Sequence, residues 1–170
     1  MQKISTIVLF VAALATAACN NPNRNGMGGA GGAGGMGGAG AIGSASDPNS
    51  PAYFSQTLGD MVHFVVDQST LTPEAQAILT KQAAWLVQHP NYTAIVQGHA
   101  DEQGTREYNL ALGARRAESA KQFLIANGVS GTRLKTISYG KEQPIALCSD
   151  ESCFQQNRRA KTALQLGGGV

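Results

Sequence analysis

Residues 98–117 read GHADEQGTREYNLALGARRA, and this stretch decides how the chain folds. The residues before it, 92–97, are rich in β-formers and predict a strand. Residues 98–104 have the small and polar side chains of a loop, after which Thr105 is a good N-cap for a helix. Apolar or small residues then recur at steps of three and four, which predicts a helix with one buried stripe: Leu110, Gly113, Ala117, Ala120 and Leu124. The stretch therefore predicts a strand, a loop and a helix in an α/β fold.

The same alternation of strand and helix signals continues on both sides of this unit. Residues 61–66 and 134–138 have the composition of strands, and a last strand is expected over residues 161–166. Upstream, Thr72 is a good N-cap for a helix that ends near His89. The predicted order is β-α-β-α-β-loop-β, a two-layer α/β sandwich in which two main helices cover one mixed sheet.

Composition confines this fold to the later part of the chain. The protein has 170 residues, enough for one domain with appendages. Between residues 26 and 43, 11 of 18 positions are glycine and none is charged or aromatic, so this stretch cannot form a core. We therefore expect a disordered, Gly-rich tether over residues 19–51 and one domain over residues 52–170. The net charge of +2 argues against nucleic acid as a partner, because such binding depends on many phosphate contacts.

The first residues have the pattern of an export signal. Lys3 precedes an apolar run over residues 7–14, and small residues follow that run. The run is too short to span a bilayer as a helix. Residues 1–18 are therefore predicted to be a signal peptide.

Residues 16–19 read TAAC, which resembles a bacterial lipobox. This pattern predicts cleavage before Cys19, acylation of that cysteine, and an anchor in the inner leaflet of the outer membrane. The alternative is ordinary cleavage after Ala17, which would release a soluble periplasmic protein. The chain has three cysteines, so an acylated Cys19 leaves Cys148 and Cys153 to form a disulfide across a short loop, and two free thiols are the alternative.

Two charged residues mark a candidate binding site at the loop and the helix that follows it. Asp101 lies in the loop that leaves the second predicted strand, where α/β folds usually place ligands. Arg116 lies beside the buried stripe of the helix, so we expect it to be half-buried and to need an anion. These two side chains could pair with each other, or they could bind a ligand that carries both an ammonium and a carboxylate.

Residues 98–117 closely resemble the signature of the OmpA-like peptidoglycan-binding domains, and the likeness covers the whole expected domain. The resemblance implies that Asp101 and Arg116 hold the amino and carboxylate groups at one end of the meso-diaminopimelate in peptidoglycan stems. It also implies ligand contacts for Asn109 and for Asp67, although the turn at Asp67 lacks the family's Phe and Asn. The late segment 157–160, NRRA, resembles a family motif whose role is more often structural.

The resemblance also implies a cellular role. Lipid-anchored members of this family are associated with peptidoglycan, with TolB and TolA as protein partners. Such a chain would be attached to the outer membrane with its domain facing the periplasm. It would support outer-membrane integrity and the invagination of that membrane during cell division. Neither a cofactor nor a metal is implied.

The main alternative is a soluble periplasmic protein that binds or enzymatically modifies peptidoglycan. The three histidines, His63, His89 and His99, do not form an HExxH motif, and no GxSxG motif is present. His99 and Asp101 could suggest a metal, but two ligands without a third are weak evidence. Asp101 and Glu102 could suggest a glycosidase pair, but adjacent residues on one loop rarely flank a substrate. The sequence therefore favours a binding domain over an enzyme.

Overall fold

The computed structural model describes residues 43–167. The predicted signal peptide, Cys19 and most of the predicted tether lie outside these residues. The strands are β1 (Met61–His63), β2 (Tyr92–His99), β3 (Leu134–Gly140) and β4 (Arg159–Leu166). The two long helices are α2 (Pro73–Gln88) and α3 (Arg106–Ala126), and the shorter helical segments are α1 (Pro51–Tyr53), η1 (Phe54–Gly59), η2 (Gly131–Arg133) and α4 (Glu151–Asn157). Among the helices of residues 43–167, none has the length and apolar character needed to cross a membrane.

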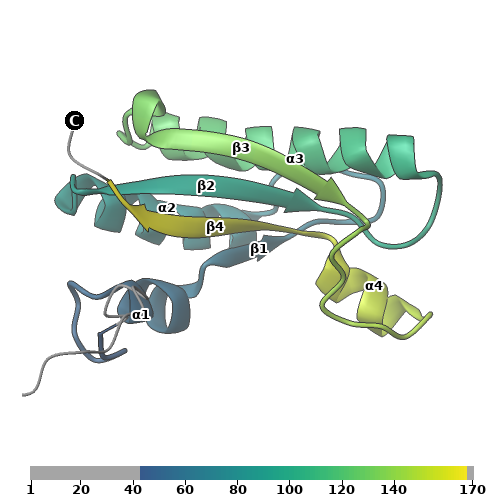
Figure 1. Cartoon of the computed structure of the whole chain (residues 1–170), viewed down its shortest axis with the longest axis horizontal. Helices are drawn as coiled ribbons and strands as arrows, with labels where there is room; N and C mark the ends of the chain where they lie inside the picture. The colour runs from purple at the N-terminus through teal and green to yellow at the C-terminus, as the bar shows by residue number, and fades with distance from the viewer. Residues whose placement is uncertain (1–42, 168–170) are drawn as a thin grey trace, which may run out of the picture. The chain divides into compact units, whose positions relative to one another are not determined.

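The four strands form one mixed sheet in the order β1-β4-β2-β3. Strand β4 is antiparallel to both of its neighbours, β1 and β2, whereas β2 and β3 are parallel. Helices α2 and α3 lie behind this sheet in Figure 1, and their buried residues pack with those of the sheet in one core. The predicted two-layer α/β sandwich with a mixed sheet is confirmed.

The sequence signals at the helix ends act as expected. The hydroxyl of Thr72 accepts a hydrogen bond from the Ala75 amide at the start of α2, at 3.2 Å. Thr105 caps α3 in the same way by accepting from the Tyr108 amide, also at 3.2 Å. Both caps satisfy an amide that has no partner inside the helix, so they fix where each helix begins. Because β2 is a central strand, the loop between its end and Thr105 starts in the middle of the sheet.

Helix α3 crosses β2 at a point where two glycines let the backbones touch. A Cβ atom at Gly98 would lie 1.8 Å from the carbonyl oxygen of Gly113, which is far inside van der Waals contact. Any side chain at Gly98 would therefore push α3 away from the sheet. This contact sets the height of α3 above β2, and with it the positions of both ends of the loop between them.

Four predicted strand boundaries and one buried position differ from the structure. Strand β2 continues to His99, two residues beyond its predicted end, because Gly98 and His99 still pair with β3. Strand β1 ends at His63, and Val65 and Val66 are exposed because the chain turns after Phe64, where the Val65 carbonyl accepts from the Gln68 amide. Strand β3 continues to Gly140, two residues beyond its predicted end, and β4 begins at Arg159, two residues earlier than predicted. Leu110 is exposed, because the buried stripe of α3 passes through Leu112 instead.

The predicted loop between the last two strands contains α4. Its N-cap is Asp150, whose side chain accepts from the amides of Ser152 and Cys153. Asn157, at the other end of α4, accepts from two loop amides and donates to the carbonyl of Ala146 at 2.8 Å. The loop and α4 therefore form one hydrogen-bonded unit.

The end of the predicted tether packs against α2. The indole Nε1 of Trp85 donates to the carbonyl of Pro48 at 2.7 Å, and His89 is hydrogen-bonded to the Asn49 side chain at 3.1 Å. Ser50 is buried and caps α1. The packed part of the chain thus begins several residues before the predicted boundary at residue 52.

Candidate ligand-binding site

A cavity of about 310 Å³ opens where the loops after β1 and β2 meet the first turns of α3. Its lining comes from these three segments: Val66, Asp67, Asp101, Gln103, Gly104, Tyr108, Asn109 and Leu112. Three of the four residues predicted to contact a ligand are therefore brought together here from separate parts of the chain. We call this cavity the loop pocket.

Asp101 lies on the inner wall of the loop pocket and is almost fully buried. One carboxylate oxygen, Oδ1, accepts from the Gln103 amide at 3.2 Å. The other, Oδ2, is 3.1 Å from Nη1 of Arg158. A carboxylate can accept about four hydrogen bonds, so this one retains acceptor capacity toward the pocket.

Asn109 connects α3 to the loop that carries Asp101. Its side chain is buried, and Nδ2 donates to the carbonyl of Gln103 at 2.7 Å. Gln103 is thus held from both sides, through its amide by Asp101 and through its carbonyl by Asn109. The wall of the pocket is built by these two bonds, so its shape is set before any ligand arrives.

Asp67 lies at the mouth of the loop pocket, on the turn after β1. Its backbone has a φ of 57°, in the left-handed region that non-glycine residues seldom occupy. Its carboxylate accepts a hydrogen bond from the hydroxyl of Tyr108 on α3. This bond raises the pKa of Tyr108, since the carboxylate stabilises the protonated phenol. The pair bridges the two sides of the mouth.

Arg116 lies behind the pocket and is fully buried, not half-buried as expected. Its Nε and Nη2 donate to the carbonyls of Gln68 and Val65, on the loop after β1, at 2.8 and 3.2 Å. Its Nη1 donates at 2.8 Å to the carbonyl of His99, at the end of β2. The guanidinium also lies 5.3 Å from the centre of the Phe64 ring. Arg116 therefore joins the two loops that form the pocket.

The hydrogen bonds of Arg116 go to neutral backbone carbonyls and not to carboxylates. Burial lowers the pKa of Arg116 to about 10, although the nearby carboxylates of Asp101 and Asp67 act in the opposite direction. With that pKa the side chain is still a cation at neutral pH. A buried cation whose hydrogen bonds go to carbonyl groups is a favourable neighbour for an added anion.

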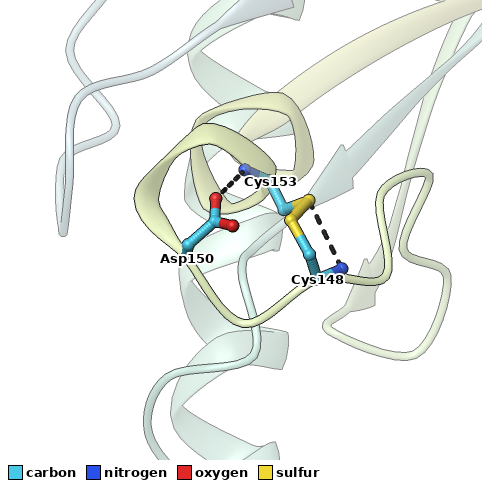
Figure 2. A group of neighbouring side chains, drawn as sticks. All are labelled: Cys148, Asp150 and Cys153. Carbon is cyan, nitrogen blue, oxygen red and sulfur yellow. Dashed lines mark hydrogen bonds between the residues drawn. A yellow bond between two sulfur atoms is a disulfide. The ribbon is translucent and has the colours of Figure 1, made fainter.

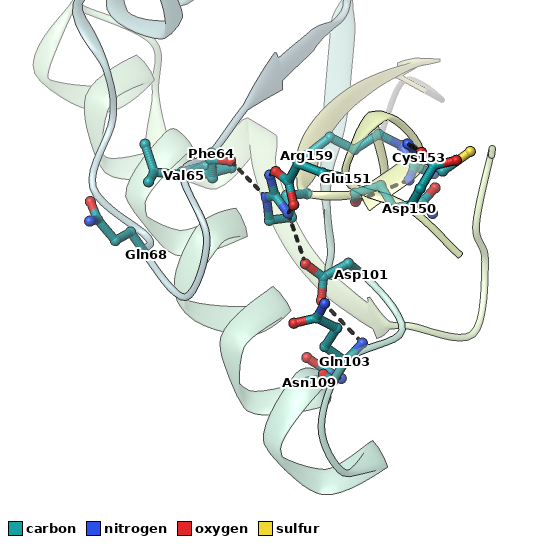
Figure 3. A network of polar contacts seen from close by, with 12 residues as sticks. Phe64, Val65, Gln68, Asp101, Gln103, Asn109, Asp150, Glu151, Cys153 and Arg159 are labelled. Carbon is teal, nitrogen blue, oxygen red and sulfur yellow. Dashed lines mark hydrogen bonds and ion pairs between the residues drawn. The ribbon is translucent and has the colours of Figure 1, made fainter. Parts of the chain in front are cut away.

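Arg158 follows α4 and is the ion-pair partner of Asp101. Its guanidinium also pairs with Glu151 through both Nη atoms, and its Nε donates to the carbonyl of Phe64 at 3.3 Å. Phe64, Asp101 and Glu151 converge in Figure 3. Burial alone would lower the pKa of Arg158, but the hydrogen bonds to Glu151 and Asp101 raise it overall.

Arg158 is not among the predicted ligand contacts, because the family resemblance implies a structural role for segment 157–160. Its pairing with Asp101 spans 57 residues, a separation that periodicity along one chain cannot detect. One sequence feature could have indicated this pairing. Arg158 belongs to the late motif 157–160, which directly precedes the last predicted strand, and that strand pairs with β2.

A disulfide joins Cys148 to Cys153 at the start of α4. Figure 2 shows Asp150 beside the two bonded sulfur atoms. These three residues are close enough to suggest a metal site. The sulfur atoms of a disulfide are not thiolates, however, and thiolates are the form in which cysteine binds metals. The arrangement instead serves to close the loop that precedes α4.

His99 lies in the core behind the pocket. Its ring is buried and stacks on Tyr139, with the ring centres 5.3 Å apart. In the part of the chain that the structure describes, neither ring nitrogen has a hydrogen-bond partner. Burial, followed by the positive charge of Arg159, lowers the pKa of His99 to about 4. His99 is therefore a neutral core residue at physiological pH.

Comparison with known proteins adds a family and several relatives. The family described as the OmpA family matches residues 63–158. A peptidoglycan-associated lipoprotein of Mesorhizobium japonicum is 54% identical over 124 residues, which cover 73% of this chain and 74% of that protein. A protein of the same name from Agrobacterium fabrum is 47% identical over 171 residues, covering 96% of this chain and 91% of that one.

Solved structures agree with these sequence matches. The crystal structure of the peptidoglycan-associated lipoprotein from Burkholderia pseudomallei has a TM-score of 0.64 and 40% identity, and the match covers 71% of this chain and 98% of that one. The C-terminal domain of Helicobacter pylori MotB has a TM-score of 0.59 at 22% identity, with 62% and 84% of the two chains covered. The second likeness shows the shared fold alone.

Proposed function

The chain belongs to the OmpA family, with the peptidoglycan-associated lipoproteins as its relatives, and on that premise we propose that its domain binds peptidoglycan without catalysing a reaction. The observation that carries the proposal is the loop pocket, where Asp67, Asp101 and Asn109 lie in front of the buried cation Arg116. Anionic and cationic groups at such short range suit a ligand group that bears an ammonium and a carboxylate on one carbon.

We infer that this ligand group is the free end of meso-diaminopimelate in a peptidoglycan stem. Its ammonium would donate to Asp101, with Asp67 as a second acceptor at the mouth. Its carboxylate would accept from the Asn109 amide and from Arg116. Three of the five N–H groups of Arg116 donate to backbone carbonyls, which leaves two for a ligand. Because Arg116 is fully buried, the carboxylate would approach the guanidinium by displacing the carbonyl of Val65 or Gln68, which frees one more N–H group for it.

The same chemistry gives the site its selectivity. A stem with lysine in place of diaminopimelate has the ammonium but lacks the neighbouring carboxylate. Arg116 would then be without its ligand partner, and a charge-assisted hydrogen bond contributes about 1.5–3 kcal/mol. This difference corresponds to an affinity ratio of roughly 10 to 150 in favour of the diaminopimelate stem.

The attachment and the protein partners are part of the proposal. We propose that Cys19 carries the lipid, so that the domain faces the periplasm from the outer membrane. The lipoprotein name of the relatives supports this assignment. We further propose that the chain works in the Tol–Pal system, with TolB and TolA as partners, and that it supports outer-membrane integrity and invagination during division. Many stems along one polymer would compensate for modest affinity at each site.

Sedimentation with purified sacculi tests the binding proposal. The protein is expected to co-sediment with diaminopimelate-type sacculi and much less with lysine-type sacculi. Asp101→Asn should abolish this co-sedimentation, whereas Glu118→Gln, a control at a partly exposed residue of α3 that pairs with Lys121, should not. Equal binding to both kinds of sacculi would contradict the assigned ligand. Release of soluble muropeptides by the wild-type protein would instead support the enzyme alternative.

A further inference from the structure

The first residue of α4, Glu151, is connected to the loop pocket through one intermediate. Both oxygens of its carboxylate accept from the guanidinium of Arg158, which is also paired with Asp101. The carboxylate of Glu151 is exposed, whereas Arg158 and Asp101 are buried. Glu151 is therefore the outer end of a chain of charges whose inner end lines the pocket.

The position of Glu151 depends on the loop before it. Asp150 caps α4 by accepting from the Ser152 and Cys153 amides, which orients the first turn. The Cys148–Cys153 disulfide closes this turn onto the preceding loop, and the Cys148 amide donates to the Cys153 sulfur at 3.3 Å. The disulfide thus holds the turn that presents Glu151 to Arg158.

Glu151 changes what Asp101 can offer to a ligand. With two carboxylates around one guanidinium, the group of three carries a net charge of −1. Without Glu151, the positive charge of Arg158 would be matched by Asp101 alone, and the group would be neutral. An ammonium that enters the pocket would then meet a weaker negative potential.

We propose that Glu151 is a positioning residue for ammonium recognition in the loop pocket, held in place by the Cys148–Cys153 disulfide. Glu151 neutralises part of the positive charge of Arg158, so that the negative charge of Asp101 remains available to the ligand ammonium. This inference rests on the proposed function, because it assigns a role in binding the same ligand group. It adds two elements, α4 and the disulfide, that do not touch the pocket.

The test compares two ligands in calorimetric titrations of the full chain: meso-diaminopimelate, and pimelate, which has the same carbon chain and both carboxylates but no ammonium. Glu151→Gln is expected to weaken binding of meso-diaminopimelate about three- to tenfold, the size of coupling usual for residues in one ionic network. Binding of pimelate should change little. A purely structural role for Glu151 would reduce both affinities equally, and that result would overturn the proposal.

Two controls separate this effect from a general change of charge. Glu142→Gln removes the same charge from an exposed pair with Arg106, 3.1 Å apart, and should leave both affinities unchanged. The Cys148→Ser/Cys153→Ser variant should weaken meso-diaminopimelate binding, but it should add nothing in a chain that already carries Glu151→Gln. Additive losses would show that the disulfide does not act through Glu151.

A second measurement does not depend on any ligand. Hydrogen exchange at the Nε–H of Arg158, followed by NMR, should be faster in Glu151→Gln than in the wild type or in Glu142→Gln. If the wild type binds neither compound, the proposed function has failed while this readout still decides whether Glu151 positions Arg158. Unchanged exchange would overturn that role.

Discussion

Two buried arginines flank the loop pocket, and they differ in the groups that accept their hydrogen bonds. On the α3 side, Arg116 donates to three backbone carbonyls. On the α4 side, Arg158 pairs with the carboxylates of Asp101 and Glu151. The pKa of Arg116 is lowered to about 10, chiefly by burial, whereas hydrogen bonds to two carboxylates raise the pKa of Arg158 despite its burial.

Because of this difference, we expect the two arginines to face different groups of the ligand. Arg116 is held by neutral acceptors, so it still attracts an added anion strongly. Arg158 lies between two carboxylates that already neutralise its charge, so it attracts an added anion only weakly. We therefore assign the ligand carboxylate to the Arg116 side. We propose that the ammonium binds on the Asp101 side, where two carboxylates share the one cation Arg158.

Removal of Arg116 is expected to have the largest effect. Arg116→Ala should remove three hydrogen bonds to backbone carbonyls, one of them buried, which costs about 3–5 kcal/mol of unfolding free energy, and it should abolish binding to diaminopimelate-type sacculi. Arg116→Lys keeps the charge but not the fork, so it should recover part of the stability and little of the binding. Urea denaturation and sedimentation measure the two effects. Arg115→Ala, at the exposed neighbouring position, is the matched control, and similar losses in both alanine variants would contradict this assignment.

Neutralisation of Asp101 tests the other side of the pocket. Asp101→Asn should reduce the affinity for meso-diaminopimelate about 10- to 100-fold, because a charge-assisted contact to the ammonium is lost. The loss of unfolding free energy should be smaller than for Arg116→Ala, since Arg158 keeps Glu151 as a partner. Calorimetric titration and urea denaturation distinguish these effects. If Asp101→Asn binds meso-diaminopimelate with wild-type affinity, the ligand ammonium does not bind to Asp101.

Acid should lower the free energy of unfolding through His99, the residue whose carbonyl accepts from Arg116. The pKa of His99 is about 4 in the folded protein against an ordinary value of 6.5, so between these values the unfolded chain binds the proton and the folded chain does not. Unfolding free energy should therefore fall as pH decreases from 6.5 to 4, by up to about 3 kcal/mol. Urea denaturation at several pH values measures this slope. His99→Phe, which can still stack on Tyr139, should flatten it, and an unchanged slope would exclude His99 as its source.

The smallest expected effect concerns the mouth of the pocket. Tyr108→Phe removes the hydroxyl that occupies Asp67, so the ligand ammonium no longer competes with it. Affinity for meso-diaminopimelate should increase about two- to threefold, the usual contribution of one exposed hydrogen bond. Titration of Tyr108→Phe in a chain that also carries Asp67→Asn provides the control. If the increase persists there, Asp67 does not contact the ligand.

The sequence predicted most of what depends on local order. The caps at Thr72 and Thr105 and the spacing along α3 are properties of neighbouring residues. The structure has both caps where they were expected, and it buries the predicted stripe of α3 except for Leu110. Asp67, Asp101 and Asn109 also meet in one pocket, although the family resemblance, not periodicity, joined Asp67 and Asn109 to it.

The remaining features depend on contacts between distant segments. Arg116 is fully buried because carbonyls from two loops close around it, and a helical stripe shows only that it lies near the core. Arg158 meets Asp101 through the pairing of β4 with β2, which no short motif encodes. Helix α4 has only seven residues, too few for a periodic pattern, and its cap and disulfide define it instead.

The contact between Trp85 and Pro48 determines how an anchored domain would be oriented. It joins the chain that enters the domain to the end of α2. In Figure 1 this end of α2 lies at the same end of the sheet as the start of β2. The residues that line the loop pocket follow the opposite end of β2. The first and last of the eight residues of β2 are about 23 Å apart. A pull on the N-terminal side would therefore act along the sheet with the pocket at the far end, so the domain would present its binding face away from the point of attachment.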